Sequence, residues 1–442
     1  MRVRGQAAAA VALLGFSAAA CTTGGHALPA PLPAVPAATR ALVGWSVAVC
    51  AAVTAADGLR TGIDEVNHTA ADPDQANFLD SSIDSYLSRT GSGAEQVRGQ
   101  LKDVPPSGVK GADAYVASLD KALGELQKKV PPTTTKQPLA KAREVAEAAT
   151  ALKPTAADLQ KAVRGDAKLN ASFNVAPGCA PVRQFGPVDA ASPTPALVTW
   201  SDAMCSATAS VTSLRAQKLG DIASDDPRFA SFGGFELGNF IGSAGSQVEQ
   251  LTATLTPLAP TGVKEADAYR TGLLAALQAV APKLPSTHGQ GMADLSFQSV
   301  DQLKPQAQQV IDVLATITVP TPDLPTAAGR SKVLANSYNV APNCRPLGSP
   351  PPSLPAAANG TDLGACQAGK CQVQVSGVAD VTVSGMPFTV SVSPNSVRLR
   401  QDTGEIVLGV GGSGKFGTAG HTVSVRVTAL LDGQAVLDIS TE

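Results

Sequence analysis

The protein is 442 residues long, and 44% of its residues are hydrophobic although only 4% are aromatic. At roughly 100–200 residues per domain, this length corresponds to two to four domains, whose cores must be built mainly from small side chains. The 41 glycines and 33 prolines exceed average usage only slightly, which excludes a collagen-like or wholly disordered chain. The net charge of −2 provides no basic excess to neutralise phosphates, which argues against nucleic acid as the main partner.

The first 20 residues have the pattern of an export signal. Arg2 and Arg4 supply a short positive region, and an apolar run over residues 7–20 follows. This run has the length of a signal-peptide core and is too short to span a bilayer. We therefore expect residues 1–20 to be a signal peptide.

Cys21 directly follows the small residues Ser17-Ala18-Ala19-Ala20. This arrangement resembles the lipobox of bacterial lipoproteins, here of the exported actinobacterial type, although Ala18 stands where that family usually has leucine. The resemblance implies that Cys21 is diacylated on its sulfur and anchors the protein in the lipid bilayer, on the extracytoplasmic face of the cell membrane. Ala18 and Ala20 also satisfy the A-x-A pattern of ordinary signal peptidase cleavage, so a freely secreted protein with an unpaired Cys21 is the alternative.

The segment after Cys21 has the composition of a flexible, partly extended chain. Gly24-Gly25 is followed by prolines at positions 29, 31, 33 and 36. We expect residues 21–39 to form a tether that separates a folded body from the membrane.

The folded body contains an internal duplication, because three signatures occur twice in the same order. A weaker echo pairs Leu152-Lys153-Pro154 with Leu303-Lys304-Pro305. Units of this size indicate tandem domains rather than a solenoid, whose repeats run about 20–50 residues. We expect copies at 40–180 and 195–345, joined by a linker at 181–194. The signatures are Trp45-x4-Cys50 and Trp200-x4-Cys205, GVKGADAY (108–115) and GVKEADAY (262–269), and SFNVAPGC (172–179) and SYNVAPNC (337–344).

Each copy has the apolar spacing of helices. Residues 112–130 carry apolar side chains at i, i+3, i+4 and i+7, which indicates an amphipathic helix with one buried face. Further helices are expected at 41–56, 78–101 and 139–169, the last broken or kinked at Pro154. Four helices in up-down order would make each copy a bundle.

The run 41–56 lacks charged residues and therefore invites comparison with a membrane span. It is short for that role, and the corresponding segment of the second copy contains Asp202. We expect a buried helix of the bundle.

The seven cysteines follow the duplication, since each copy has one early and one late cysteine. An even number of antiparallel helices returns the chain to its starting end, where the two can form a disulfide that stabilises each copy by roughly 4–5 kcal/mol. Cys21 is then the odd cysteine, and acylation explains why a spare thiol exists in an oxidising compartment. The predicted pairs are Cys50–Cys179, Cys205–Cys344 and Cys366–Cys371.

The chain changes character after a proline-rich stretch at 346–359, which we expect to be a semi-rigid linker. Apolar and polar residues then alternate with period two, which indicates about six or seven short strands within 360–442. Asp432-Gly433 is typical of a hairpin turn. The opening, Cys366-x4-Cys371-Gln-Val-Gln-Val, resembles small β-modules at the ends of actinobacterial secreted proteins, a resemblance that implies no known chemistry. The expected fold is multidomain α then β: two tandem disulfide-clasped helical bundles followed by a small antiparallel β sandwich or barrel.

The segment Gly409–Lys415 matches the G-x4-G-K pattern of a phosphate-binding loop. Phe416 stands at the position of the Ser or Thr that should hold Mg²⁺, and the following residues indicate a strand rather than a helix. Only 27 residues follow Lys415, which is too few for the α/β domain of a nucleotide-binding enzyme. We expect a loop between strands.

No other pattern indicates catalysis or a bound cofactor. The four histidines are scattered, no G-x-S-x-G or H-E-x-x-H motif occurs, and no metal site is expected. Asp113 and Tyr115 recur as Asp267 and Tyr269, and for these a packing or capping role is favoured over a ligand site.

Two functions fit these patterns. The first is a non-enzymatic lipoprotein of the cell envelope that acts as an extracellular interaction or scaffold protein for an unknown envelope protein or glycan. The second is a small-molecule or solute-binding lipoprotein with a cleft between the helical repeats.

Overall fold

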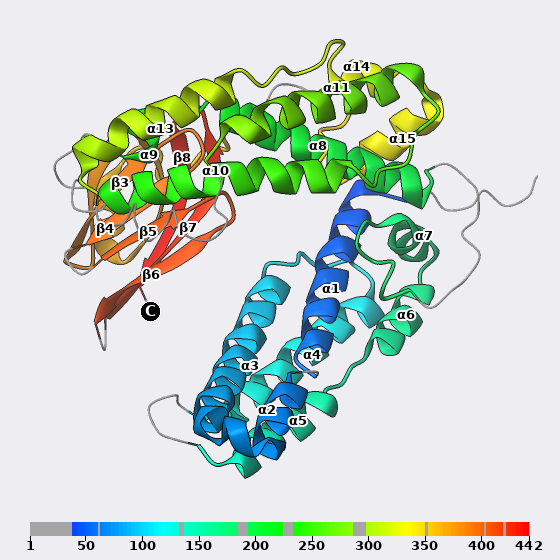
Figure 1. The fold of residues 1–442 in the computed structure, drawn as a ribbon, viewed down its shortest axis with the longest axis vertical. Helices are drawn as coiled ribbons and strands as arrows, with labels where there is room; N and C mark the ends of the chain where they lie inside the picture. The colour runs from blue at the N-terminus through cyan, green and yellow to red at the C-terminus, as the bar shows by residue number, and fades with distance from the viewer. Residues whose placement is uncertain are drawn as a thin grey trace, which may run out of the picture. The chain divides into compact units, whose positions relative to one another are not determined.

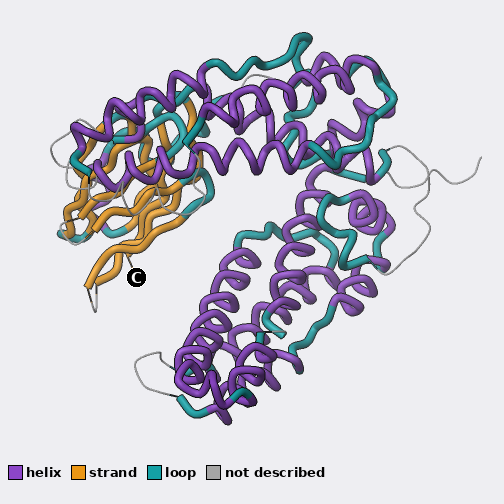
Figure 2. The backbone as a smooth tube through the Cα atoms, viewed as in Figure 1, coloured by secondary structure: helices purple, strands orange, loops and turns teal. Residues whose placement is uncertain are grey.

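Figure 1 shows the fold as a computed structural model, which describes residues 38–60, 62–131, 137–183, 193–223, 233–285, 298–349, 352–401, 404–418 and 421–441. A helix-rich N-terminal region is followed by an antiparallel β region of two sheets, as Figure 2 shows by the change from purple to orange. This order of helices before strands is the one predicted. The predicted signal peptide, Cys21 and residues 21–37 of the predicted tether lie outside the described residues.

The helices of the first copy confirm the predicted ones at 41–56, 78–101 and 112–130. Thr39 caps the first of these, because its Oγ1 accepts a hydrogen bond from the backbone N–H of Leu42. The elements in chain order are α1 (Arg40–Gly58), α2 (Ile63–Ala71), the 3-10 helix η1 (Pro73–Phe78), α3 (Leu79–Lys102), α4 (Lys110–Lys129), α5 (Leu139–Thr150), α6 (Ala156–Arg164) and α7 (Ala167–Val175).

The predicted helix at 139–169 breaks at Pro154, as expected, and breaks again at Asp166. Thr155 and Asp158 form a capping box at the start of α6, with the Asp158 carboxylate 2.8 Å from the Thr155 N–H. Asp166 Oδ1 accepts from the N–H of Leu169, 2.8 Å away, and so begins α7. The capping box of Thr155 and Asp158 and the Asp166 cap therefore divide one apolar pattern into three helices.

The second copy contains a matching series of helices. Pro305 lies inside α13, whereas Pro154 lies in the turn before α6, so the weak echo between these two segments does not mark corresponding positions. The elements are α8 (Pro195–Arg215), α9 (Leu219–Ile222), α10 (Gly233–Leu255), α11 (Lys264–Val280), η3 (Ala281–Lys283), α13 (Val300–Ala315), α14 (Leu324–Ala328) and α15 (Lys332–Val340).

Among the described residues, one helical segment, Arg40–Ala71, is long and apolar enough to cross a membrane by length and composition. Apolar residues of this segment belong to the helical core, since Val43, Trp45 and Val49 of α1 are buried by neighbouring helices. A buried core helix meets the same length and hydropathy criteria, and α1 agrees with the predicted buried helix.

The β region forms two four-stranded antiparallel sheets, in the orders β1-β8-β7-β6 and β2-β3-β4-β5. The Asp432-Gly433 turn connects β7 to β8, with positive φ angles of 49° and 73°, as expected for a tight hairpin. The strands are β1 (Lys370–Ser376), β2 (Val378–Val383), β3 (Met386–Val392), β4 (Val397–Gln401), β5 (Gly404–Leu408), β6 (Ser413–Thr418), β7 (His421–Leu431) and β8 (Gln434–Thr441), preceded by the 3-10 helix η4 (Leu363–Ala368).

The buried apolar side chains form two separate clusters. One runs continuously through the helices from Val43 to Cys344, so the two sequence copies share a connected core. The other lies within the β region, where Phe388 of β3 stacks on Phe416 of β6 with ring centroids 5.9 Å apart. The β region therefore has a core of its own.

Candidate functional site

Three disulfide bonds lie within the described residues, and they join the same pairs that the sequence predicted: Cys50–Cys179, Cys205–Cys344 and Cys366–Cys371. In both long-range bonds, the sulfur of the later cysteine lies close to a backbone carbonyl oxygen of the first helix of its copy. Cys179 Sγ lies 3.2 Å from the Ser46 carbonyl oxygen, and Cys344 Sγ lies 3.1 Å from the Ser201 carbonyl oxygen. Each bond ties the first helix of a copy to the segment after its last helix.

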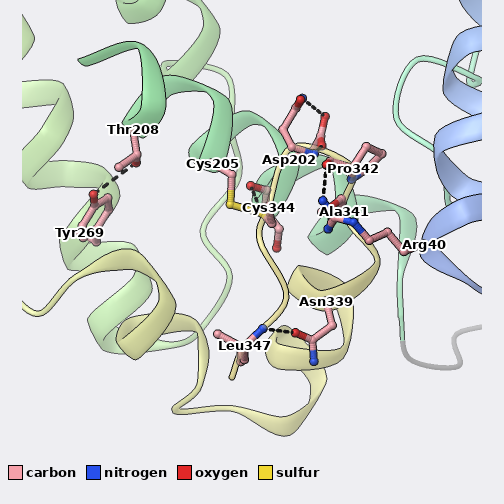
Figure 3. The surroundings of a disulfide bond; sticks show 12 residues. Arg40, Asp202, Cys205, Thr208, Tyr269, Asn339, Ala341, Pro342, Cys344 and Leu347 are labelled. Carbon is pink, nitrogen blue, oxygen red and sulfur yellow. Dashed lines mark hydrogen bonds between the residues drawn. A yellow bond between two sulfur atoms is a disulfide. The ribbon is translucent and has the colours of Figure 1, made fainter. Parts of the chain in front are cut away.

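Polar contacts surround the Cys205–Cys344 bond (Figure 3). Asp202 of α8 accepts hydrogen bonds from the backbone N–H and the Nδ2 of Asn343, at 2.8 and 3.0 Å. Burial raises the pKa of Asp202, although these hydrogen bonds and the nearby Arg40 guanidinium act in the opposite direction. The first copy has Val47 and Gly178 at the corresponding positions, so this polar clamp belongs to the second copy alone.

Arg40 connects the two copies at this point, although it belongs to the first turn of α1. Its guanidinium donates to the carbonyl oxygens of Ala341 and Pro342, at 2.6 and 2.5 Å (Figure 3). Ala341 is the C-cap of α15, where a positive charge is favourable because the last carbonyls of a helix are unsatisfied. Arg183 serves the first copy in the same way, since it donates to the carbonyl oxygens of Asn174 and Ala176 at the end of α7.

The repeated aspartates fix the turns that begin two corresponding helices. Asp113 accepts from the N–H and the hydroxyl of Ser107, both at 2.7 Å, and Asp267 accepts from the N–H and the hydroxyl of Thr261, at 2.7 and 2.9 Å. Their carboxylates are therefore engaged in local structure. This arrangement favours the capping role.

The repeated tyrosines lie in the core. Tyr115 and Tyr269 are both buried, and burial raises the pKa of each phenol. The hydroxyl of Tyr269 lies 3.2 Å from Thr208 Oγ1, within hydrogen-bonding distance. These contacts are those of packing side chains.

Residues 409–412 of the segment that resembles a phosphate-binding loop connect β5 to β6, as predicted, whereas residues 413–415 belong to β6 rather than to a loop. Gly411 has a φ of +79°, a backbone conformation that glycine can adopt in a tight turn because it has no Cβ atom. Lys415 lies within β6 opposite Ser424, and Phe416 packs into the β core. No helix N-terminus follows the glycines, so the anion-binding geometry of such a loop is not formed.

A groove of about 610 Å³ lies between α8 and α10 and is the candidate ligand site. All of its lining residues are uncharged, and alanines and leucines alternate with hydroxyl and amide side chains. Such a surface suits an uncharged ligand that has both polar and apolar groups. The polar lining residues include Ser206, Ser210 and Ser213 of α8 and Gln247, Gln250 and Thr254 of α10.

The corresponding helices of the first copy, α1 and α3, pack closely. A Cβ atom added to Gly93 of α3 would lie only 2.8 Å from Cδ2 of Leu59, so these two residues meet directly. By the spacing of the repeated signatures, Gln247 and Leu214 occupy the matching places in the second copy. Sequence reasoning missed this groove because serine and glutamine on a helix are typical of an ordinary solvated face.

Within the described residues, no group of three or more His, Cys, Asp or Glu side chains is placed to hold a metal ion. Comparisons with protein-family models, with curated proteins and with solved structures found no match to this chain.

Proposed function

We propose that the protein is a non-enzymatic lipoprotein of the cell envelope, anchored through acylated Cys21, that acts as an extracellular interaction or scaffold protein. The disulfide set is the observation that supports this proposal most directly. Six of the seven cysteines pair with one another, which leaves Cys21 as the remaining one. Disulfides persist in oxidising compartments, and an acylated cysteine there removes the liability of a free thiol.

We further propose that the helical region is built as two tandem bundles, at 40–180 and 195–345, followed by the β domain at 360–442. The matched sulfur contacts of Cys179 and Cys344 support this division, as do the matched turns at Asp113 and Asp267. Because the two copies share a continuous core, they act as one structural unit rather than as two independent modules. This unit would present its surfaces to an envelope protein or glycan.

Localisation tests the anchor. Cys21→Ala should release the protein into the medium, and the lipoprotein signal peptidase inhibitor globomycin should cause the unprocessed precursor to accumulate. Ser17→Ala serves as the matched control, since it keeps the small-residue pattern and should stay in the membrane fraction. If the Cys21→Ala variant stays in the membrane fraction, the lipoprotein proposal is wrong.

The groove between α8 and α10 favours a second candidate function, the capture of a small uncharged ligand. Ser210→Trp would fill the groove, whereas Ala55→Trp places the same side chain on an exposed site of α1 at the corresponding position. Native mass spectrometry of protein purified from its own membranes should find a bound mass in the wild type and in Ala55→Trp but not in Ser210→Trp. An identical spectrum for all three proteins would reject this function.

A further inference from the structure

A pocket of about 250 Å³ lies in the first copy, at the end of α3, and is formed by residues of α1, α3, α4 and the α3–α4 loop (Figure 1). Its lining includes Trp45 of α1, Pro105 and Pro106 of the loop, and Val116 of α4. These side chains form an apolar wall, on which the methylene stem of a long side chain can pack. The pocket is separate from the groove between α8 and α10.

The corresponding place in the second copy is occupied by a side chain of the protein itself. Arg270 of α11 stands where the first copy has Val116, because the repeated signature ends directly before both residues. Its Nε donates to the carbonyl oxygen of Leu255 and its Nη2 to that of Thr256, at 3.1 and 2.8 Å. The guanidinium group therefore bridges the carbonyls at the end of α10, where a cation is favoured.

The turn that carries these carbonyls has the same hydrogen bond in both copies. The N–H of Val104 donates to the carbonyl oxygen of Leu101 at 3.2 Å, and the N–H of Leu258 donates to that of Leu255 at 3.3 Å. The end of α3 therefore presents its carbonyl groups in the way that the end of α10 does. Leu101 is also part of the pocket lining.

The carbonyl group of Lys102 has no donor in the following turn. Lys102 corresponds to the residue of the second copy whose carbonyl accepts from Nη2 of Arg270. Three and four positions after Lys102 stand Pro105 and Pro106, and proline has no N–H to donate. The hydrocarbon side chain of Val116 cannot donate either. The first copy thus retains the acceptor without the arginine that pairs with it in the second.

The charged side chains at the pocket balance one another. Asp113 and Asp120 of α4 and Lys102 of α3 belong to its lining. Arg98 forms an ion pair with Asp120, with Nε 2.9 Å from Oδ1, so these two charges cancel. Asp113 and Lys102 carry one charge each, and the exposed Lys102 can extend its amino group into water. Selectivity for a guanidinium group would therefore come from the carbonyl acceptors rather than from net charge.

We propose that this pocket binds the side chain of an arginine that a partner polypeptide presents. The guanidinium group lies at the carbonyl oxygens of Leu101 and Lys102, and the methylene stem lies on the apolar wall. A guanidinium group is planar and carries a fork of donors, which suits two neighbouring acceptors better than the ammonium group of lysine does. This inference rests on the proposed interaction function, for which it names one contact, and does not depend on acylation of Cys21.

The two tryptophans, one in each copy, report separately on the pocket and on its counterpart. In nuclear magnetic resonance spectra of the full chain with isotope-labelled tryptophan, Trp45 and Trp200 each give one indole signal. N-acetyl-arginine amide, which resembles an arginine within a polypeptide, should shift the Trp45 signal with a Kd on the order of 1 mM. The Trp200 signal should not change, because Arg270 already occupies that place. N-acetyl-citrulline amide, which is uncharged, should shift neither signal.

Three variants test where the probe binds. Val116→Arg gives the first copy the arginine of the second and should abolish the shift of the Trp45 signal. Ser118→Arg is the matched control, since it places the same side chain on an exposed site of α4 outside the pocket lining and should retain the shift. Ala117→Phe fills the pocket from an exposed lining position and should weaken binding about tenfold or more, which provides an independent variant if Val116→Arg fails to fold.

The proposal would be overturned if the arginine probe left the Trp45 signal of the wild type unchanged, or if the shift persisted in folded Val116→Arg or Ala117→Phe. An equal shift with the citrulline probe would exclude recognition of the guanidinium group. Tighter binding of free arginine than of the capped amide would indicate a small-molecule site in place of a polypeptide contact. Because the purified chain is used, a failure of this test is distinguishable from a failure of the Cys21 localisation test.

Discussion

Removal of individual disulfides tests how much each loop closure stabilises the fold. The bonds close loops of very different length, with sequence separations of 129 residues for Cys50–Cys179, 139 for Cys205–Cys344 and 5 for Cys366–Cys371. In the chain-entropy model, the stabilisation grows with the logarithm of loop length, which gives about 5 kcal/mol for each long loop and about 2 kcal/mol for the short one. Paired Cys→Ala variants are the appropriate change, because the cysteines are buried and alanine introduces no unsatisfied hydroxyl.

Urea unfolding of the three paired variants, followed by circular dichroism, measures the free energy of unfolding of the helical region. The Cys50/Cys179 and Cys205/Cys344 variants should lose similar amounts, each about 5 kcal/mol, since their loops are nearly equal. The Cys366/Cys371 variant is the control, because it lies in the separate β core and should leave the helical transition unchanged. A long-loop variant that loses less than about 1 kcal/mol would refute the entropic reasoning.

Three further predictions follow from contacts in the helices and in the β5–β6 turn. Gly245→Ala should destabilise the second copy by about 1–3 kcal/mol in thermal melts, because the added Cβ atom would lie 2.6 Å from the Pro285 carbonyl oxygen. Gly99→Ala is the control, since its Cβ atom would meet open space and the change should be neutral or stabilising. Equal destabilisation by the two substitutions would contradict this prediction. Arg40→Met should cost about 1–2 kcal/mol in urea unfolding through loss of the α15 cap, and an unchanged midpoint would argue against that cap. Isothermal titration should detect no ATP or GTP binding, because Gly409–Gly412 form a turn between strands and Lys415 lies within β6; micromolar binding that Lys415→Ala abolishes would refute this interpretation.

The amino-acid sequence by itself was sufficient for features that depend on local patterns. The apolar spacing of residues 112–130 predicts α4, and the Asp432-Gly433 pair predicts the β7–β8 hairpin, because helix periodicity and turn geometry involve residues close in the chain. The duplication also carried long-range information, since one early and one late cysteine in each copy indicated the pairs Cys50–Cys179 and Cys205–Cys344.

Weak local signals explain the elements that were missed. β5 is short and shows little of the alternation typical of a strand. Residues 413–415 of β6 lay within the phosphate-loop pattern, so the start of β6 was not predicted although a strand was expected after Lys415. The sandwich alternative of the predicted fold implies two sheets, but which strands form each sheet was not predictable, because sheet partners are chosen by packing of side chains from distant segments.

Only the tertiary structure decided which polar residues meet. Arg40 reaches carbonyl groups 301 and 302 positions away, and Arg398 meets Glu236 across 162 positions. The groove between α8 and α10 depends on the distance between these two helices. Gln247 of α10 stands where the first copy has Gly93, which contacts Leu59 closely, but no local sequence pattern predicts how far the helices separate. Such contacts arise because burial of apolar side chains sets the approach of the elements, and the polar groups on their surfaces must then find partners wherever that packing places them.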